Sequence, residues 1–252
     1  MSAFESMGSR SLRLTGAMLF AGVFALSACS ESTGPDQLVD EALNEDVAVI
    51  AADGALADLE VMTTPSFVFG TPGPQMVEPM RDRSVTWFDE AGAAMTRYDA
   101  LLTASGQIEA SFSRSATREG WSASVDRSRS LTVTGLLGEE TQRTWNGSGS
   151  GEVSGSRHVD GKGTRSYEMS YTSEMSDVVR AVDRQAQPWP LSGTITRMVE
   201  ATRTDAEGVS ETRTRTTVLT FNGTQMATLT VDGEVFEVDL GAREGRKPVR
   251  KR

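Results

Sequence analysis

Residues 191–240, LSGTITRMVEATRTDAEGVSETRTRTTVLTFNGTQMATLTVDGEVFEVDL, decide the fold. Two runs in which side-chain character alternates, 191–204 and 209–221, are separated by the four residues DAEG at 205–208. A period of two is typical of a β-strand, because successive side chains point to opposite faces of a sheet. The two runs therefore predict an antiparallel pair of long strands.

Two further turns follow in the same stretch. Asn222-Gly223 precedes a run at 225–231, and Asp232-Gly233 precedes a run at 234–240. Asn-Gly and Asp-Gly are strong hairpin signals, because a type I′ turn needs a positive φ at both central residues. The chain is thus expected to wind back and forth as an antiparallel meander.

The alternating pattern extends upstream, and we interpret residues 81–242 as one antiparallel β domain. Runs at 85–88 and 93–98 predict one hairpin, and runs at 108–118 and 121–130 predict a second. Further strands are expected at 131–137, 141–145, 152–158 and 165–172, with Gly-rich breaks at 146–151 and 160–163. No long helical pattern separates the strands, which argues against parallel βαβ units.

We therefore expect an all-β fold, either one large twisted sheet or an open barrel. Arg213 and Arg215 share one face of the 209–221 run, while Thr212, Thr214 and Thr216 share the other. Because neither face is apolar there, we expect a thin core and long strands that are buried only at one end.

The part that precedes the β domain is acidic. Residues 29–80 contain ten Asp and Glu and no Lys or Arg. Apolar residues recur at spacings of three and four from Leu38 to Ala51, which is the helical period, and Gly54 is a candidate for the helix end. We divide this part into an acidic tether with a helix (29–62) and a Pro/Gly linker (63–80). The helix is expected either to pack on the sheet or to act as an acidic spacer.

The last ten residues, 243–252, carry six basic residues and one acidic residue. They have no apolar period, so we expect a disordered basic tail. Such a tail would contact an anionic envelope surface, fold back on the acidic tether, or remain solvated.

The first 28 residues have the character of a signal peptide. Arg10 and Arg13 precede an apolar run at 14–26. This run is shorter than the roughly 20 residues that a membrane-spanning helix needs. A basic start, a short apolar middle and small residues before a cut point predict a secretory signal.

The leader ends in Leu26-Ser27-Ala28-Cys29, which resembles the lipobox of bacterial lipoprotein signal peptides. The resemblance implies cleavage before Cys29 and acylation of its thiol, which would anchor the protein to a membrane without a transmembrane helix. Ser30, where Asp would favour inner-membrane retention, resembles an outer-membrane sorting signal. The alternative is an ordinary signal peptide with a chance Cys. Beyond Cys29 the chain resembles uncharacterised β-rich envelope lipoproteins with a short Ser-Thr-Gly-Pro tether.

Composition excludes several function classes. One His and one Cys cannot supply a usual zinc site, and nothing in the sequence favours a Ser-His-Asp or Cys-His constellation. With 25 Lys and Arg against 35 Asp and Glu, the net charge is −10, so nucleic acid is a poor partner. His158 is expected at the surface, and Trp87, Trp121, Trp145 and Trp189 are expected to pack rather than line a ligand site. We predict no catalytic residue, no metal site and no cofactor.

We therefore expect a lipid-anchored, non-enzymatic protein of the cell envelope, on the outer membrane, with a structural or binding role. The first alternative is a periplasmic carrier of lipid or another apolar ligand, because such carriers are known as antiparallel half-barrels with helices over the mouth. The second alternative is a weak carboxylate-based hydrolase.

Overall fold

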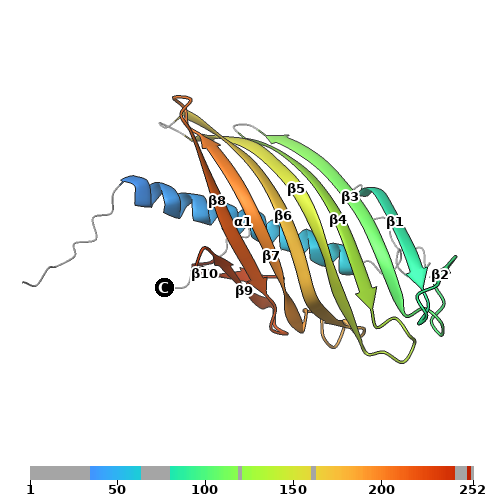
Figure 1. Cartoon of the computed structure of the whole chain (residues 1–252). Coiled ribbons are helices and arrows are strands. Elements are labelled where there is room, and N and C mark those ends of the chain that lie inside the picture. Colours follow the sequence, from blue (N-terminus) through green and yellow to red (C-terminus); the bar gives the residue numbers. More distant parts are fainter. Residues whose placement is uncertain (1–34, 64–79, 119–120, 160–162, 242–248, 251–252) are drawn as a thin grey trace, which may run out of the picture.

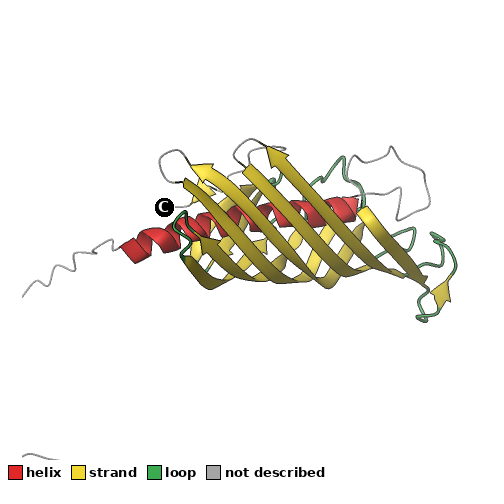
Figure 2. Ribbon diagram, turned by 90° about the horizontal axis from the view of Figure 1, so that it is seen from above, coloured by secondary structure: helices red, strands yellow, loops and turns green. Residues whose placement is uncertain are grey.

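The computed structural model describes residues 35–63, 80–118, 121–159, 163–241 and 249–250. Within this part of the chain, one helix lies along one face of an eleven-stranded antiparallel sheet (Figures 1 and 2). The elements are α1 (Pro35–Thr63), β1 (Met80–Phe88), β2 (Ala94–Met95), β3 (Ser105–Arg118), β4 (Trp121–Thr134), β5 (Gln142–Val159), β6 (Gly163–Ala181), β7 (Ser192–Thr204), β8 (Ser210–Thr220), β9 (Met226–Val231), β10 (Glu234–Asp239) and β11 (Val249–Arg250).

The strands follow one another across the sheet in nearly the order of the chain. The spatial order is β11-β10-β9-β8-β7-β6-β5-β4-β3-β1-β2, so that β1 lies between β3 and β2. The two ends of the sheet do not pair with each other, and the sheet stays open. The expected all-β meander with an N-terminal helix is confirmed, as a sheet rather than a closed barrel.

The Asp-Gly turn has the predicted geometry, but the Asn-Gly turn does not. Asp232 and Gly233 have φ values of 45° and 91° and join β9 to β10 as a two-residue type I′ hairpin. At the other turn only Gly223 has a positive φ, of 80°. There the chain takes a longer path from Thr220 to Met226, and the Asn222 carboxamide oxygen accepts a hydrogen bond from the Thr224 N–H (3.0 Å). Asn222-Gly223 therefore turns the chain into β9 as predicted, but without the type I′ geometry that the Asn-Gly signal favours.

The expected break at 146–151 was also wrong, because β5 runs through it as one strand from Gln142 to Val159. Glycine alternates with serine here, so each face of the strand carries one residue type. A β-carbon on Gly149 would lie 2.6 Å from Arg129 Cδ, and one on Gly151 would lie 2.5 Å from the Tyr171 hydroxyl. The glycines make room for long side chains that neighbouring strands lay across β5. Residues 131–134 likewise continue β4 and do not form a separate strand.

α1 passes through Gly54 without interruption, so this glycine does not end the helix, and the helical part extends to Thr63. Gly54 is buried against the sheet, where a β-carbon would lie 3.3 Å from Arg197 Nη2. Small residues allow the helix axis to approach the strands closely, and all of them are nearly inaccessible: Ala48, Ala51, Ala52 and Ala55. The helix thus packs on the sheet and helps to form its core.

We define the helix face of the sheet as the face that α1 covers, and the outer face as the opposite one. On the helix face of β7, Ile195, Arg197 and Val199 are only 1%, 2% and 3% exposed. The expectation of strands buried only at one end holds for β8, whose buried residues, Thr217 and Leu219, lie at one end. In β7 burial extends further, from Ile195 to Ala201.

Charge is largely separated between these two faces in β1 and β3–β8, with Glu211 of β8 as a carboxylate on the helix face. Alternation and strand register place these arginines on the helix face: Arg83, Arg127, Arg129, Arg143, Arg165, Arg180, Arg197, Arg203, Arg213 and Arg215. They place these carboxylates on the outer face: Asp82, Glu109, Asp126, Glu152, Glu168, Glu174 and Glu200. Among the described side chains of these strands, no Lys or Arg occupies an outer position.

Part of the basic tail is ordered, contrary to expectation. Val249 and Arg250 form β11 and pair with Glu237 and Phe236 of β10. The edge of β10 offers unpaired backbone groups, which an extended tail segment can satisfy. The signal peptide, Cys29, residues 64–79 of the linker and the rest of the tail lie outside the described residues. In the part that is described, no helix is both long and apolar enough to cross a membrane.

Candidate binding surface

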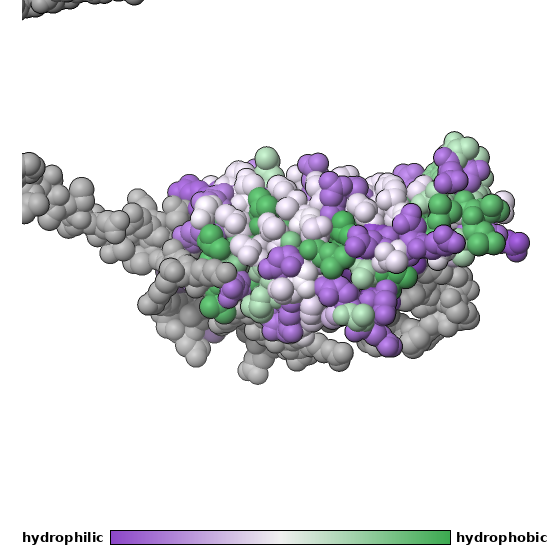
Figure 3. Space-filling model, turned by 90° about the horizontal axis from the view of Figure 1, so that it is seen from below, coloured by the Kyte–Doolittle hydropathy of each residue, from purple (hydrophilic) through white to green (hydrophobic). Residues whose placement is uncertain are grey.

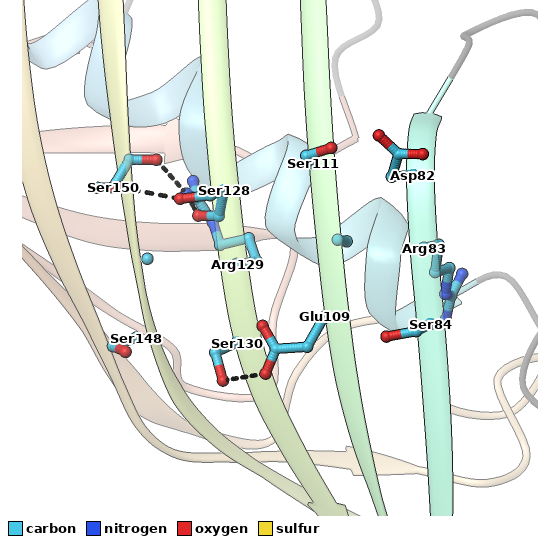
Figure 4. A pocket seen from close by; sticks show the side chains of 12 residues that line it. Asp82, Arg83, Ser84, Glu109, Ser111, Ser128, Arg129, Ser130, Ser148 and Ser150 are labelled. Atoms are coloured by element: carbon cyan, nitrogen blue, oxygen red, sulfur yellow. Dashed lines mark hydrogen bonds between the residues drawn. The ribbon is translucent and has the colours of Figure 1, made fainter.

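The outer face of β1, β3, β4 and β5 carries hydroxyl and carboxylate groups in register. One cross-strand row consists of Ser84, Glu109, Ser130 and Ser148, and the next consists of Asp82, Ser111, Ser128 and Ser150. These side chains line a shallow groove with a volume of about 690 Å³, to which Arg83, Ala110, Arg129 and Gly149 also contribute (Figure 4). Because each position follows from the strand register, the polar rows are as rigid as the sheet.

Hydrogen bonds join these side chains across the strands. Ser130 Oγ donates to Glu109 Oε1 (2.6 Å), and Gln107 Nε2 donates to the same oxygen (3.2 Å). The hydroxyls of Ser128 and Ser150 lie 2.9 Å apart (Figure 4). Both bonds hold the Glu109 carboxylate through its Oε1 atom against the sheet.

Similar hydroxyl pairs continue along the outer face toward the hairpin tips, each at 2.8 Å: Ser122 with Ser156, Thr202 with Thr212, and Thr204 with Ser210. Such pairs stabilise neighbouring strands by roughly 0.2–1 kcal/mol each. Together with the outward carboxylates they form a negatively charged surface rich in hydrogen-bonding groups. Its chemistry suits a cationic ligand that also donates hydrogen bonds.

The helix holds this sheet through a buried ion pair that sequence analysis missed. Asp58 of α1 accepts hydrogen bonds from Arg129 Nε (2.5 Å) and Arg197 Nη2 (2.6 Å). The Asp58 and Arg197 side chains are only 3% and 2% exposed. Tyr171 lies beside both arginines, and its hydroxyl accepts a hydrogen bond from Arg129 Nη2 (3.3 Å). We call these four residues the Asp58 lock.

Burial and charge act in opposite directions within the Asp58 lock. Burial alone would lower the pKa of Arg129, but the Asp58 carboxylate and Tyr171 outweigh it and raise that pKa above its usual value. Burial prevails at Arg197 and lowers its pKa despite Asp58. Arg197 Nη1 also donates to the carbonyl of Ala51 (3.0 Å), which anchors the guanidinium to the helix backbone.

A third arginine holds the C-terminal part of the helix. Arg180 donates to the carbonyl of Leu59 (3.2 Å) and to that of Pro188 (2.9 Å). Burial lowers the pKa of Arg180 to about 10, so it remains charged at neutral pH. A cation there is favoured by the negative C-terminal end of the helix dipole.

A signal for the Asp58 lock is present in the sequence. Residues Ala51, Ala55, Asp58 and Met62 recur at spacings of three and four, so an acid occupies a position on the buried helix face. Arg129 lies two residues from the buried Leu131, and Arg197 lies two residues from the buried Ile195. Residues two apart on a strand share a face, so both arginines lie on the core face. Charged residues at apolar positions of two elements indicate a buried pair.

The other residues that sequence analysis singled out lie apart from this surface or within the core. Trp87 and Trp145 are buried, which confirms their packing role, and Trp189 is half-buried. His158 is exposed near the end of β5, with Nδ1 3.3 Å from Thr164 Oγ1. Among the described residues, no three His, Cys, Asp or Glu side chains gather as ligands for a metal ion. Cys29 and the side chain of Trp121 lie outside the described set.

Comparison with protein-family models, with curated proteins and with solved structures gave no match for this chain. The function is therefore argued from the geometry. The groove is lined mainly by polar residues, and the buried apolar side chains of the helix face lie beneath α1. A carrier of apolar ligands requires an accessible apolar cavity, which this groove does not offer.

Proposed function

We propose that this protein is a lipid-anchored, non-enzymatic binding protein of the cell envelope whose outer sheet face binds a cationic partner. The separation of charge between the two sheet faces carries this proposal. Arginines that would neutralise the carboxylates point to the helix instead, so the outer face presents one sign of charge. The partner that fits is a polypeptide segment rich in Lys or Arg.

The strength of such a surface comes from its many charges acting together. A single exposed ion pair is worth only about 0–1 kcal/mol. A wide surface of one sign raises the association rate and makes binding strongly dependent on ionic strength. The hydroxyl rows add hydrogen-bond partners that repeat from strand to strand. This repeat favours an extended ligand that carries several amines.

Neutralising the outer face should weaken binding to a polycation. We expect the variant Glu109→Gln/Glu152→Gln/Glu174→Gln to bind polylysine at least about tenfold more weakly, which corresponds to 1.4 kcal/mol. Binding is measured by titration at two salt concentrations, and the variant should also show the shallower salt dependence.

The matched control is Glu45→Gln/Glu139→Gln/Glu140→Gln, which removes three exposed carboxylates that lie elsewhere. It changes the net charge by the same amount, so a binding loss equal to that of the first variant would show that only net charge matters. That result would contradict a specific role for the outer face.

The anchor is the second part of the proposal. Substitution Cys29→Ala is expected to release the protein from the membrane fraction, because acyl chains stabilise binding by about 0.8 kcal/mol for each CH₂. Cell fractionation and mass spectrometry of the N-terminal peptide measure this. A Cys29→Ala protein that remained in the membrane pellet would contradict the anchor.

The position of the basic tail supports the same location. The first turns of α1 and the C-terminal strand β11 lie at the same end of the molecule (Figures 1 and 2). We propose that the tail adds a second membrane contact at that end, since each base near anionic headgroups contributes about 1 kcal/mol.

A further inference from the structure

An exposed pair of leucines stands at the end of the molecule where β2 lies. Leu101 and Leu102, in the connection from β2 to β3, are 82% and 58% exposed. Hydrophobic residues gather at this end in the space-filling view (Figure 3). Isolated surface leucines are common, but two adjacent ones at a loop tip need a reason.

The loop is built to hold these leucines outward. Asp99 Oδ1 accepts a hydrogen bond from Leu101 N (2.9 Å), and the Asp99 carbonyl accepts from Leu102 N (3.2 Å) and Thr103 N (2.8 Å). Thr103 is fully buried, and its Oγ1 accepts from Asp99 N (2.9 Å). The turn is therefore closed at its base by both backbone and side-chain bonds.

A neighbouring loop supports the turn from the side. Gly138 N, in the connection from β4 to β5, donates to the carbonyl of Ala100 (2.7 Å). Tyr98 donates its hydroxyl hydrogen to the carbonyl of Leu136 (3.2 Å). Two loops thus fix one tip, so the exposure of the leucines is a property of an ordered surface.

The surroundings of the tip limit what it can contact. Glu139 and Glu140 follow Gly138 and are exposed. Carboxylates beside an apolar tip disfavour contact with an anionic surface and allow contact with neutral headgroups.

We propose that Leu101 and Leu102 enter the interfacial layer of a bilayer of neutral phospholipids when the protein is anchored. This rests on the proposed lipid anchor. Two leucines bury too little apolar area to hold a protein on a membrane by themselves. An anchored protein makes the contact intramolecularly, at a high effective concentration.

The contact would fix how the body lies. The 29 residues of α1 extend over about 44 Å, and the leucine tip lies at the end opposite the start of the helix (Figures 1 and 2). A chain anchored before the helix and touching lipid at the other end lies along the membrane.

The test uses the acylated, full-length protein with one spin label. Cys29 is the only cysteine, so a Leu101→Cys substitution provides the only free thiol once Cys29 is acylated. The matched control is Val209→Cys, because Val209 is 65% exposed at the tip between β7 and β8. Both proteins are added to phosphatidylcholine/phosphatidylethanolamine vesicles and floated, and label accessibility to oxygen and to an aqueous nickel complex is measured.

We expect the Leu101 label to gain oxygen collisions and lose nickel collisions on the vesicles, while the Val209 label does not change. A floated protein whose Leu101 label stays as accessible to nickel as the Val209 label would overturn the lipid contact. If the Leu101 label lost nickel collisions only after a second protein was added, the lipid contact would also be overturned. Failure to float would instead contradict the anchor, which keeps the two proposals distinguishable.

Discussion

Substitution of Asp58 by Asn is expected to lower the free energy of unfolding by about 3–5 kcal/mol. The carboxamide has the shape of the carboxylate but no charge, so Arg129 and Arg197 would remain buried beside a neutral group. Both guanidiniums are bound to Asp58 at 2.5 and 2.6 Å in a site closed to water. Urea unfolding followed by tryptophan fluorescence measures the loss.

The control for this prediction is Glu45→Gln, which removes an exposed carboxylate from the same helix and should change stability by less than about 0.5 kcal/mol. A second variant separates charge from packing. Asp58→Leu combined with Arg129→Met and Arg197→Met replaces the whole ion pair by apolar side chains, and it should regain much of the lost stability. Equal stability of Asp58→Asn and Glu45→Gln would show that the Asp58 lock does not stabilise the fold.

Substitution Gly151→Ala is expected to cost about 1–3 kcal/mol. The added β-carbon would lie 2.5 Å from the Tyr171 hydroxyl oxygen and 2.8 Å from the backbone oxygen of Asp126. Tyr171 is packed against Arg129 and Arg197, so its displacement would disturb the Asp58 lock as well. The change is read from the midpoint of urea unfolding.

The neighbouring residue provides the control. Ser150 is exposed on the outer face of the same strand, and its hydroxyl lies 2.9 Å from that of Ser128. The substitution Ser150→Ala removes this hydrogen bond. We expect a change within about 0.5 kcal/mol. If Gly151→Ala were as stable as Ser150→Ala, the interpretation of the β5 glycines as space for Arg129 and Tyr171 would be refuted.

The elements with local signals could be predicted. Asp232-Gly233 fixes a two-residue hairpin through the φ values of its own two residues, and the period of two is intrinsic to long paired strands. The helical period before the sheet predicts α1 in the same way. In each case neighbouring residues contain the information.

The features that depended on distant partners could not be predicted. Gly54 weakens a helix by about 1 kcal/mol relative to Ala, but here it lies against Arg197, which is far along the chain. The Gly and Ser run at 146–151 has low β propensity, yet side chains of Arg129 and Tyr171 pack across it and make it a strand. Charged and hydroxyl residues alternate along the sequence of single strands, as at 209–221. The groove could not be predicted, because it depends on the register between β1, β3, β4 and β5.

The meander also determines the order in which the protein can fold. Almost every strand pairs with a neighbour in sequence, so hairpins can close over short loops, at low contact order. The helix is different: Asp58 meets Arg129 across 71 residues, and Asn44 meets Arg215 across 171 residues. The helix α1, which precedes every described strand in the chain, must therefore wait for nearly the last strands before it can dock.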